Sequence, residues 1–125
     1  LIQAGLAATD VKPAIATSST REKSEAVLRS AGIPYRKMAY ITGSDVTDKK
    51  PDPELFLRAA QAIKLAPSRC VVFEDAPDGV EAARRAGSRC VAVTNSTSAS
   101  RLAGADRVVA TLEEISLADC RNLIA

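Results

Sequence analysis

The sequence contains neither histidine nor tryptophan, and aromatic residues make up only 3% of its 125 positions. The absence of histidine excludes zinc sites built on imidazole and Ser-His-Asp catalytic triads. Because aromatic side chains are so scarce, the core must be built from alanine, valine, leucine and isoleucine. Hydrophobic residues nevertheless account for 46% of the chain, and this share excludes an intrinsically disordered segment.

Cysteine is also scarce, and the three thiols at Cys70, Cys90 and Cys120 show no C-x-x-C spacing. An odd number of cysteines without that spacing is not typical of a disulfide framework or a zinc site. Cys70 and Cys90 each begin an apolar run, where a reduced thiol behaves as a small hydrophobic side chain.

No apolar run approaches the ~20 residues of a membrane-spanning helix, and no signal peptide is visible. Lysine and arginine number 17 against 15 acidic residues, for a net charge of +2. The basic doublets Lys49-Lys50 and Arg84-Arg85 are too short for a nucleic-acid footprint. We therefore expect one soluble, cytoplasmic domain that binds neither a membrane nor nucleic acid.

Short apolar runs alternate with helical patterns along the chain. The strongest strand prediction covers residues 70–74, which are apolar up to the last position, as in a strand covered on both faces. Further strands are predicted over 14–17, 40–42, 90–94 and 107–110, and helices over about 22–31, 54–64, 77–86 and from 117 onward. The alternation predicts an α/β fold, a three-layer, Rossmann-like parallel sheet flanked by helices.

Capping residues indicate where the helices begin and end. Ser19 and Glu22 have the spacing of a capping box, and Gly32 is placed to terminate the helix that follows. Asp52 and Pro53 predict an N-cap and a first helical residue for the next helix.

The predicted sheet places polar side chains along one edge. Ligands of open α/β sheets bind beyond the carboxyl ends of the strands. At those ends the sequence has Thr17-Ser18, Glu74-Asp75 and Thr94-Asn95. The hydroxyl pair also precedes a helix, and the free N–H groups of a helix N-terminus favour a phosphate group.

The end of the 70–74 strand raises an electrostatic question. Adjacent carboxylates repel each other and lose hydration when buried, so Glu74 and Asp75 require either exposure to water or a nearby cation. Each polar feature, taken alone, also has an ordinary interpretation. Thr17 fits a helix cap, Lys50 fits a solvated loop residue, and the two acids fit an exposed strand end.

Their combination is more specific. The segments AIATSSTRE, KKPDPELF and VVFEDAPDGVEAARRAG, in this order, resemble motifs two, three and four of the haloacid dehalogenase-like hydrolase superfamily. Within it, the match is closest to the phosphatase and β-phosphoglucomutase-like branch. The acidic pair also favours that branch, because dehalogenation itself needs no metal.

The resemblance implies a role for each matching residue. Thr17 would hydrogen-bond a phosphoryl oxygen, with help from the backbone amides of Ser18 and Ser19. Lys50 would neutralise the phosphoryl charge and steady the attacking carboxylate, as a catalytic residue. The substrate implied is a small phosphorylated metabolite.

The resemblance also implies a metal site. Glu74 and Asp75 would hold Mg²⁺ directly or through its waters, which fits the preference of that ion for few carboxylates and several waters. A divalent cation would keep both acids ionised. The reaction implied is phosphoric-monoester hydrolysis through an aspartyl-phosphate. A hexose-phosphate mutase of the same family and a non-catalytic binding relative remain alternatives.

The first motif of the family, an Asp-x-Asp that supplies the nucleophile and the acid/base, does not occur in this sequence. The cap domain that normally follows it is missing as well. We therefore interpret residues 1–125 as the C-terminal portion of such a core domain. In the family, the motif-one strand lies centrally, so its loss would either leave a gap in the sheet or force the neighbouring strands to pair.

Overall fold

A computed structural model describes the backbone of residues 1–125 and every side chain except those of Ile2 and Gln3. The strands are β1 (Ala14–Ala16), β2 (Ala39–Ile41), β3 (Val71–Glu74), β4 (Arg89–Val93) and β5 (Arg107–Val109). The α-helices are α1 (Ile2–Ala7), α2 (Arg21–Ser30), α3 (Glu54–Ala62), α4 (Pro77–Ala86) and α5 (Leu117–Leu123). The short 3-10 helices are η1 (Tyr35–Lys37), η2 (Pro67–Arg69), η3 (Ala99–Leu102) and η4 (Leu112–Glu114).

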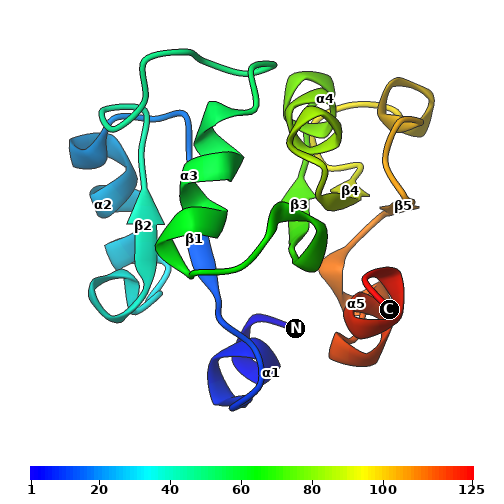
Figure 1. Cartoon of the computed structure of the whole chain (residues 1–125), viewed down its shortest axis with the longest axis horizontal. Helices are drawn as coiled ribbons and strands as arrows, with labels where there is room; N and C mark the ends of the chain where they lie inside the picture. Colours follow the sequence, from blue (N-terminus) through cyan, green and yellow to red (C-terminus); the bar gives the residue numbers. More distant parts are fainter.

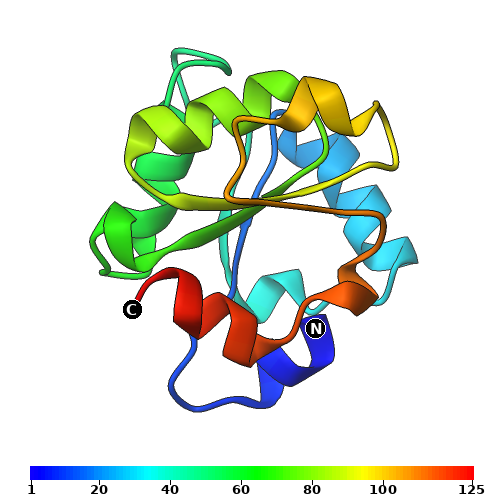
Figure 2. The same ribbon diagram turned by 90° about the vertical axis from the view of Figure 1, so that its right-hand side faces the viewer.

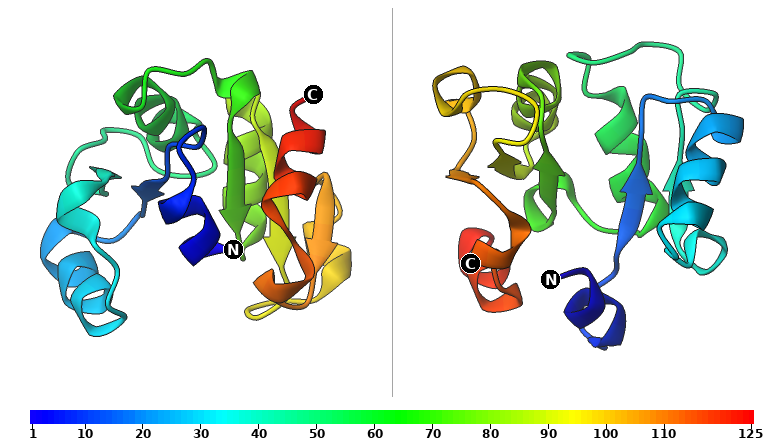
Figure 3. Two further views of the ribbon diagram at one scale, coloured as in Figure 1. Left: turned by 90° about the horizontal axis from the view of Figure 1, so that it is seen from below. Right: turned by 180° about the vertical axis from the view of Figure 1, so that it is seen from behind.

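The strands form two parallel sheets, β1-β2 and β3-β4-β5 (Figure 1). Ile15 lies opposite Tyr40 in the first sheet, and Phe73 lies opposite Val91 in the second. Across the described backbone, no hydrogen-bonded ladder joins β1 to β3. β1 and β3 nevertheless point in the same direction (Figure 3, right). The predicted α/β fold with parallel strands is confirmed, and of the two alternatives for its centre, the gap is the one observed.

Helices cover both faces of each sheet, as the prediction of three layers requires. α4 and α5 lie on opposite sides of β3, β4 and β5 (Figure 2). α2 and α3 lie on opposite sides of β1 and β2 (Figure 3, left). Along β4, Cys90 and Ala92 contribute to the core beneath α4, whereas Val91 packs in a second cluster with Cys120 and Leu123 of α5.

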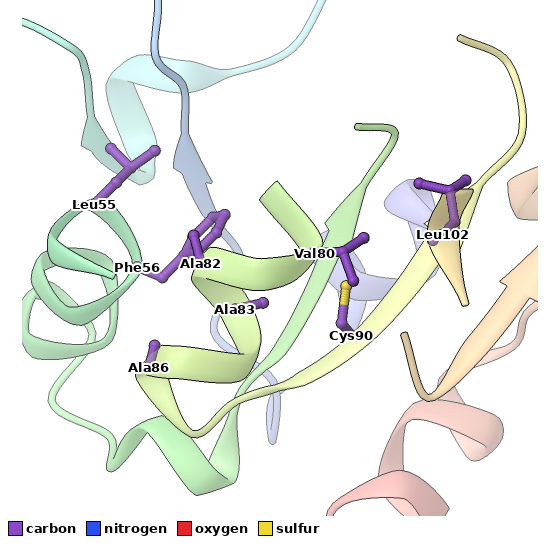
Figure 4. Packing of buried hydrophobic residues seen from close by; sticks show 9 residues of the cluster. Leu55, Phe56, Val80, Ala82, Ala83, Ala86, Cys90 and Leu102 are labelled. Atoms are coloured by element: carbon purple, nitrogen blue, oxygen red, sulfur yellow. The ribbon is translucent and has the colours of Figure 1, made fainter. Parts of the chain in front are cut away.

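One apolar cluster connects the two sheets. It is formed by side chains from α3, α4, β4 and η3 (Figure 4): Leu55, Phe56, Val80, Ala82, Ala83, Ala86, Cys90, Ala92 and Leu102. Ala16 and Ile41 from the first sheet and Val72 from the second pack against it. Packing between α3 and α4 therefore holds the two sheets together in the absence of hydrogen bonds between β1 and β3.

The cysteine predictions can be compared with the burial of each thiol. Cys90 is 2% exposed in the core, and burial, reinforced by the charges of Glu74 and Asp106, raises its thiol pKa to about 12. Cys70 lies just before β3 and is partly buried, which also raises its pKa. Both thiols therefore stay protonated at neutral pH, as expected for small hydrophobic side chains.

Several helix boundaries differ from the predictions. The N-cap of α2 is Thr20, whose hydroxyl accepts from the Lys23 amide at 3.4 Å, so the predicted Ser19–Glu22 capping box is wrong. Pro53 occupies the N-cap of α3, one residue after the predicted Asp52. Gly32 does follow the end of α2 in a left-handed conformation, with φ at +72°.

Two further differences concern the end of α3 and the burial of β3. α3 ends at Ala62 rather than at 64, because Lys64 adopts a left-handed backbone with φ at +59°. β3 is not covered on both faces throughout, since Phe73 is 38% exposed. The helix α1 was not predicted. Within the described chain, no helix has the length and apolar character needed to cross a membrane.

Replacing Leu55 by alanine tests whether the α3–α4 cluster holds the fold together. Leu55 is 2% exposed, so Leu55→Ala should lower the free energy of unfolding by about 2–5 kcal/mol, measured by urea denaturation. The matched control is Leu57→Ala on the same helix, where the side chain is 41% exposed and the expected change is within about 0.5 kcal/mol. Equal losses in the two variants would contradict the described packing.

Candidate active site

The carboxylate of Glu74 lies at the end of β3 and pairs with Lys50. Lys50 Nζ is 2.7 Å from Glu74 Oε2, and the two side chains are only 16% and 10% exposed. The same ammonium lies 5.3 Å from the centroid of the Phe56 ring. Lys50 comes from the loop after β2, so the ion pair connects the β1-β2 side of the molecule with the β3 side.

Gly79 in the first turn of α4 makes room for the Glu74 side chain. A Cβ atom at position 79 would overlap the Cγ, Cδ and Oε2 atoms of Glu74. The helix can therefore pass close to the end of β3 only because this position has no side chain.

Asp75 has a different set of neighbours from Glu74. The Ser96 hydroxyl donates to Asp75 Oδ2 at 2.6 Å, and the Asp75 amide donates to Glu74 Oε1 at 3.1 Å. The Ser96 hydrogen bond is the main cause that lowers the pKa of Asp75 below its ordinary value, against the opposing effect of burial. Glu74 and the positive charge of Lys50 lower this pKa further, so Asp75 is ionised at neutral pH.

The hydroxyl cluster after β1 forms a tight loop. The Ser19 amide donates to Thr17 Oγ1 at 3.2 Å, and the Gly43 amide donates to the Ser19 carbonyl at 2.8 Å. A Cβ atom at Gly43 would overlap the Ser18 carbonyl, so the loop after β2 lies directly against this one. Among the described contacts, the Ser18 amide has no hydrogen-bond acceptor.

Arg21, the first residue of α2, pairs with Asp45 in the loop after β2. Arg21 Nη2 is 2.8 Å from Asp45 Oδ2, and that oxygen also accepts from the amide of Thr42 at 2.8 Å and from its hydroxyl at 3.0 Å. The hydrogen bond from the Thr42 amide is the main cause of the lowered pKa of Asp45. The Asp45 carboxylate thus fixes the start of the loop that leads to Lys50.

The predicted site residues fall into two groups. Lys50, Glu74 and Asp75 are connected by direct contacts, and Ser96 extends this group. Thr17 and its neighbours lie at the carboxyl end of the other sheet, and no contact between the two groups is found among the described side chains. Ser96 was missed from the sequence, although its position just after a strand end was a signal.

The acidic pair matches the donor chemistry of a hard divalent cation. Glu74 and Asp75 offer carboxylate oxygens alone, and within the described contacts Asp75 Oδ1 accepts no hydrogen bond. Mg²⁺ typically takes one or two carboxylates and completes its shell with water. No cluster of three or more metal-ligating side chains occurs in the described part of the chain, so water would supply the other ligands of an ion bound here. The two carboxylates fit the protein side of such a water-rich Mg²⁺ site.

A cavity of about 700 Å³ lies away from this rim. Its lining includes Pro13, Met38 and Ile63, near the amino ends of β1 and β2. The polar residues at the carboxyl ends of the strands, not the cavity, therefore define the candidate site.

Comparison with known proteins identifies the family of the chain. The sequence profile of haloacid dehalogenase-like hydrolases matches residues 1–87. The chain belongs to the haloacid dehalogenase-like hydrolase family. Validoxylamine A 7'-phosphate phosphatase from Streptomyces hygroscopicus subsp. limoneus is 41% identical over 101 residues, which cover 81% of this chain and 47% of that protein.

Solved structures of the family superpose on the whole fold. A family hydrolase from Deinococcus radiodurans R1, with bound phosphate and sodium, has a TM-score of 0.85 at 32% identity and covers 98% of this chain and 58% of its own. β-Phosphoglucomutase from Clostridium difficile has a TM-score of 0.82 at 25% identity, with 98% and 53% covered. The chain thus spans about half the length of these relatives.

Replacing Gly79 by alanine tests the contact beneath Glu74. Alanine is the better helix former, yet Gly79→Ala should displace Glu74 from Lys50. We expect a net loss of about 1–3 kcal/mol in unfolding free energy, since losing a partly buried ion pair outweighs a helix gain of at most about 1 kcal/mol. Gly5→Ala is the control, because an added Cβ there meets no described atom within 4 Å. A stabilised Gly79→Ala variant would refute the contact.

Replacing Ser96 by alanine tests the environment of Asp75. The pKa of Asp75, followed by carboxyl NMR, should rise toward its ordinary value of 3.8 in Ser96→Ala. A lowered folded-state pKa stabilises the fold above the ordinary pKa, and this contribution disappears as the pH falls through the folded-state pKa. The variant should therefore lose about 0.5–1 kcal/mol at pH 7 and less at acidic pH.

The matched control for that measurement is Ser98→Ala. The Ser98 hydroxyl contacts Ser100 at 3.1 Å, and both residues are exposed. The Asp75 pKa should be the same in Ser98→Ala as in the original chain. An unchanged Asp75 pKa in Ser96→Ala would show that the serine is not its hydrogen-bond donor.

Proposed function

We propose that this chain carries the phosphate- and metal-binding half of a Mg²⁺-dependent phosphoric-monoester hydrolase. The observation that carries the proposal is the Lys50–Glu74–Asp75 cluster at the carboxyl ends of the strands, in a chain of this family. The name of the phosphatase from Streptomyces hygroscopicus supports a small phosphorylated metabolite as substrate. The reaction would proceed through an aspartyl-phosphate.

The loop after β1 would hold the phosphoryl group. The Thr17 hydroxyl already accepts a hydrogen bond from the Ser19 amide, which leaves its proton available for a phosphoryl oxygen. The Ser18 amide would donate to a second oxygen. The Ser19 amide would orient the Thr17 hydroxyl through the hydrogen bond that it donates to Oγ1.

Lys50 would compensate negative charge, which is the main requirement of phosphoryl transfer. Its ammonium has three donors, of which Glu74 takes one at 2.7 Å. The remaining donors would serve the phosphoryl group and the attacking carboxylate. Glu74 would thereby have two roles, since it would orient Lys50 and also form part of the metal site.

Glu74 and Asp75 would hold Mg²⁺, which, when bound, would neutralise charge on the phosphoryl oxygens. Asp75 would be the direct ligand, since its Oδ1 atom accepts no hydrogen bond from a described residue. The hydrogen bond from Ser96 would fix the carboxylate in the orientation that presents this oxygen. Glu74 would act through ordered water while it stays paired with Lys50.

The attacking carboxylate would come from residues outside this sequence. β1 and β3 run parallel with facing edges that the described backbone leaves unpaired. A strand between them would end at the same rim as Thr17 and Glu74, which is where the family carries its Asp-x-Asp. We therefore extend the proposal to a longer protein, of which residues 1–125 form the C-terminal portion of the core.

A hexose-phosphate mutase is the second candidate. The structural similarity to β-phosphoglucomutase from Clostridium difficile favours it, and the same rim would serve both reactions. A non-catalytic binding relative is the third, and it differs from both in having no need of a metal.

A Mg²⁺ titration of the chain tests the metal site. Thermal unfolding should shift upward with Mg²⁺, corresponding to about 1.4 kcal/mol at a tenfold excess over Kd. The shift should be lost in Asp75→Asn, which keeps the shape but halves the charge of the donor pair. The chain alone should not hydrolyse p-nitrophenyl phosphate, with or without Mg²⁺.

Asp78→Asn, which neutralises an exposed acid in the first turn of α4, is the control and should retain the Mg²⁺ response. No response in the original chain would favour the non-catalytic alternative. Hydrolysis by the chain that persists in Asp75→Asn would contradict both the metal site and the need for an external nucleophile.

A further inference from the structure

The loop of residues 42–53 carries Lys50 to Glu74, yet it contains neither a strand nor a helix. It leaves β2 and reaches α3 by a long path over the carboxyl ends of the strands (Figure 1). A loop of this kind places a lysine reproducibly only if contacts elsewhere hold it. The question is therefore which residues fix its course next to Lys50.

Glu54, the first residue of α3, points back into this loop. Its Oε1 atom accepts from the amide of Thr47 at 3.0 Å and from the amide of Asp48 at 2.9 Å. Its Oε2 atom lies 3.1 Å from the Thr47 amide. Charged acceptors form stronger hydrogen bonds than neutral ones, so the carboxylate fixes the backbone two residues before Lys50.

Arg58, one helical turn later, holds the carboxylate of Glu54 in place. Arg58 Nε is 2.8 Å from Glu54 Oε2, and the Glu54 side chain is 18% exposed. The Asp48 amide is the largest cause that lowers the pKa of Glu54, followed by Arg58. The acid is therefore ionised at neutral pH and linked to helix and loop at once.

The neighbouring residues complete the attachment. The Asp52 amide donates to the Lys49 carbonyl at 3.0 Å, and Asp52 Oδ1 accepts from the Glu54 amide at 2.9 Å. Val46 packs against the core cluster. Backbone atoms at 48 and 49 are thus both fixed to the start of α3, and Lys50 is the next residue.

We propose that Glu54 is a positioning residue that holds the ammonium of Lys50 at the active-site rim. It touches no reacting group and acts through the backbone of the loop. The importance of Glu54 for activity rests on the proposed function of Lys50. The contact of Glu54 with the loop is observed independently of that function. The competing explanation is that Glu54 only stabilises the N-terminus of α3 through the helix dipole.

The test measures the accessibility of Lys50 in the chain as it exists. Lys50 is 16% exposed and ion-paired, so acetylation by an N-hydroxysuccinimide ester, read by mass spectrometry, should be slow. In Glu54→Gln, the charge-assisted hydrogen bonds are weakened, and the rate at Lys50 should rise on the order of tenfold. The rates at the exposed Lys12, Lys23 and Lys64 should not change.

Glu22→Gln is the matched control, because Glu22 is also an acid in the first turn of an α-helix but makes no described contact with a loop. It should leave the Lys50 rate unchanged. Arg58→Gln, at a side chain that is 49% exposed, provides a milder second variant if Glu54→Gln does not fold. It should raise the Lys50 rate on the order of threefold.

An unchanged Lys50 rate in a folded Glu54→Gln variant, or in Arg58→Gln where the first does not fold, would overturn the proposal. So would an equal rise in Glu22→Gln, which would point to a general loss of stability rather than to the contact of Glu54 with the loop. The measurement needs no Mg²⁺, phosphate or turnover. A failure of the proposed enzymatic function therefore leaves its outcome interpretable.

Discussion

The ion pair between Lys50 and Glu74 links the two halves of the molecule, whose sheets are not joined by hydrogen bonds between strands. One partner belongs to the loop after β2 and the other to the end of β3, and β1 and β3 share no ladder in the described backbone. At such low exposure the attraction is stronger than in water, but each charge also loses hydration. The pair is therefore stable only because its surroundings are built for it. Gly79 leaves room for the carboxylate, and the hydrogen bonds of the 42–53 loop bring the ammonium to it.

The same pair answers the electrostatic question that the sequence VVFED poses. Glu74 and Asp75 are adjacent but do not share one environment. Lys50 compensates the charge of Glu74, whereas a hydrogen bond from Ser96 and partial exposure to water serve Asp75. The two acids are thus compensated by different neighbours. A Mg²⁺ ion bound at the site would add to this compensation.

The parts of the fold that follow local rules could be predicted from the sequence, and the rest depends on contacts between distant segments. Hydrophobic runs give the strands to within a residue or two, and Gly32 marks a helix end because few other residues adopt its left-handed backbone. The capping box at Ser19 was wrong because the loop after β2 engages that residue's carbonyl, which moves the cap to Thr20. For the contact of Ser96 with Asp75 the sequence offers only the position of Ser96 near a strand end, and the contact of Glu54 with its loop has no local pattern. Such roles become visible only when the chain is folded.

The division of the site into two groups follows from the topology. The Thr17 loop is tied to the start of the loop after β2, and the far end of that loop, which carries Lys50, is tied to α3, so hydrogen bonds hold both groups in place. Separate elements that are already ordered lose little further conformational entropy when a ligand binds between them. If the proposed nucleophile enters on a strand between β1 and β3, it would meet charge-compensating groups that are in place on both sides. Hydrogen bonds to the free edges of β1 and β3 would then add to the stability of that assembly. The strand that fills the gap between β1 and β3 would thus both complete the sheet and bring the nucleophile to the active site.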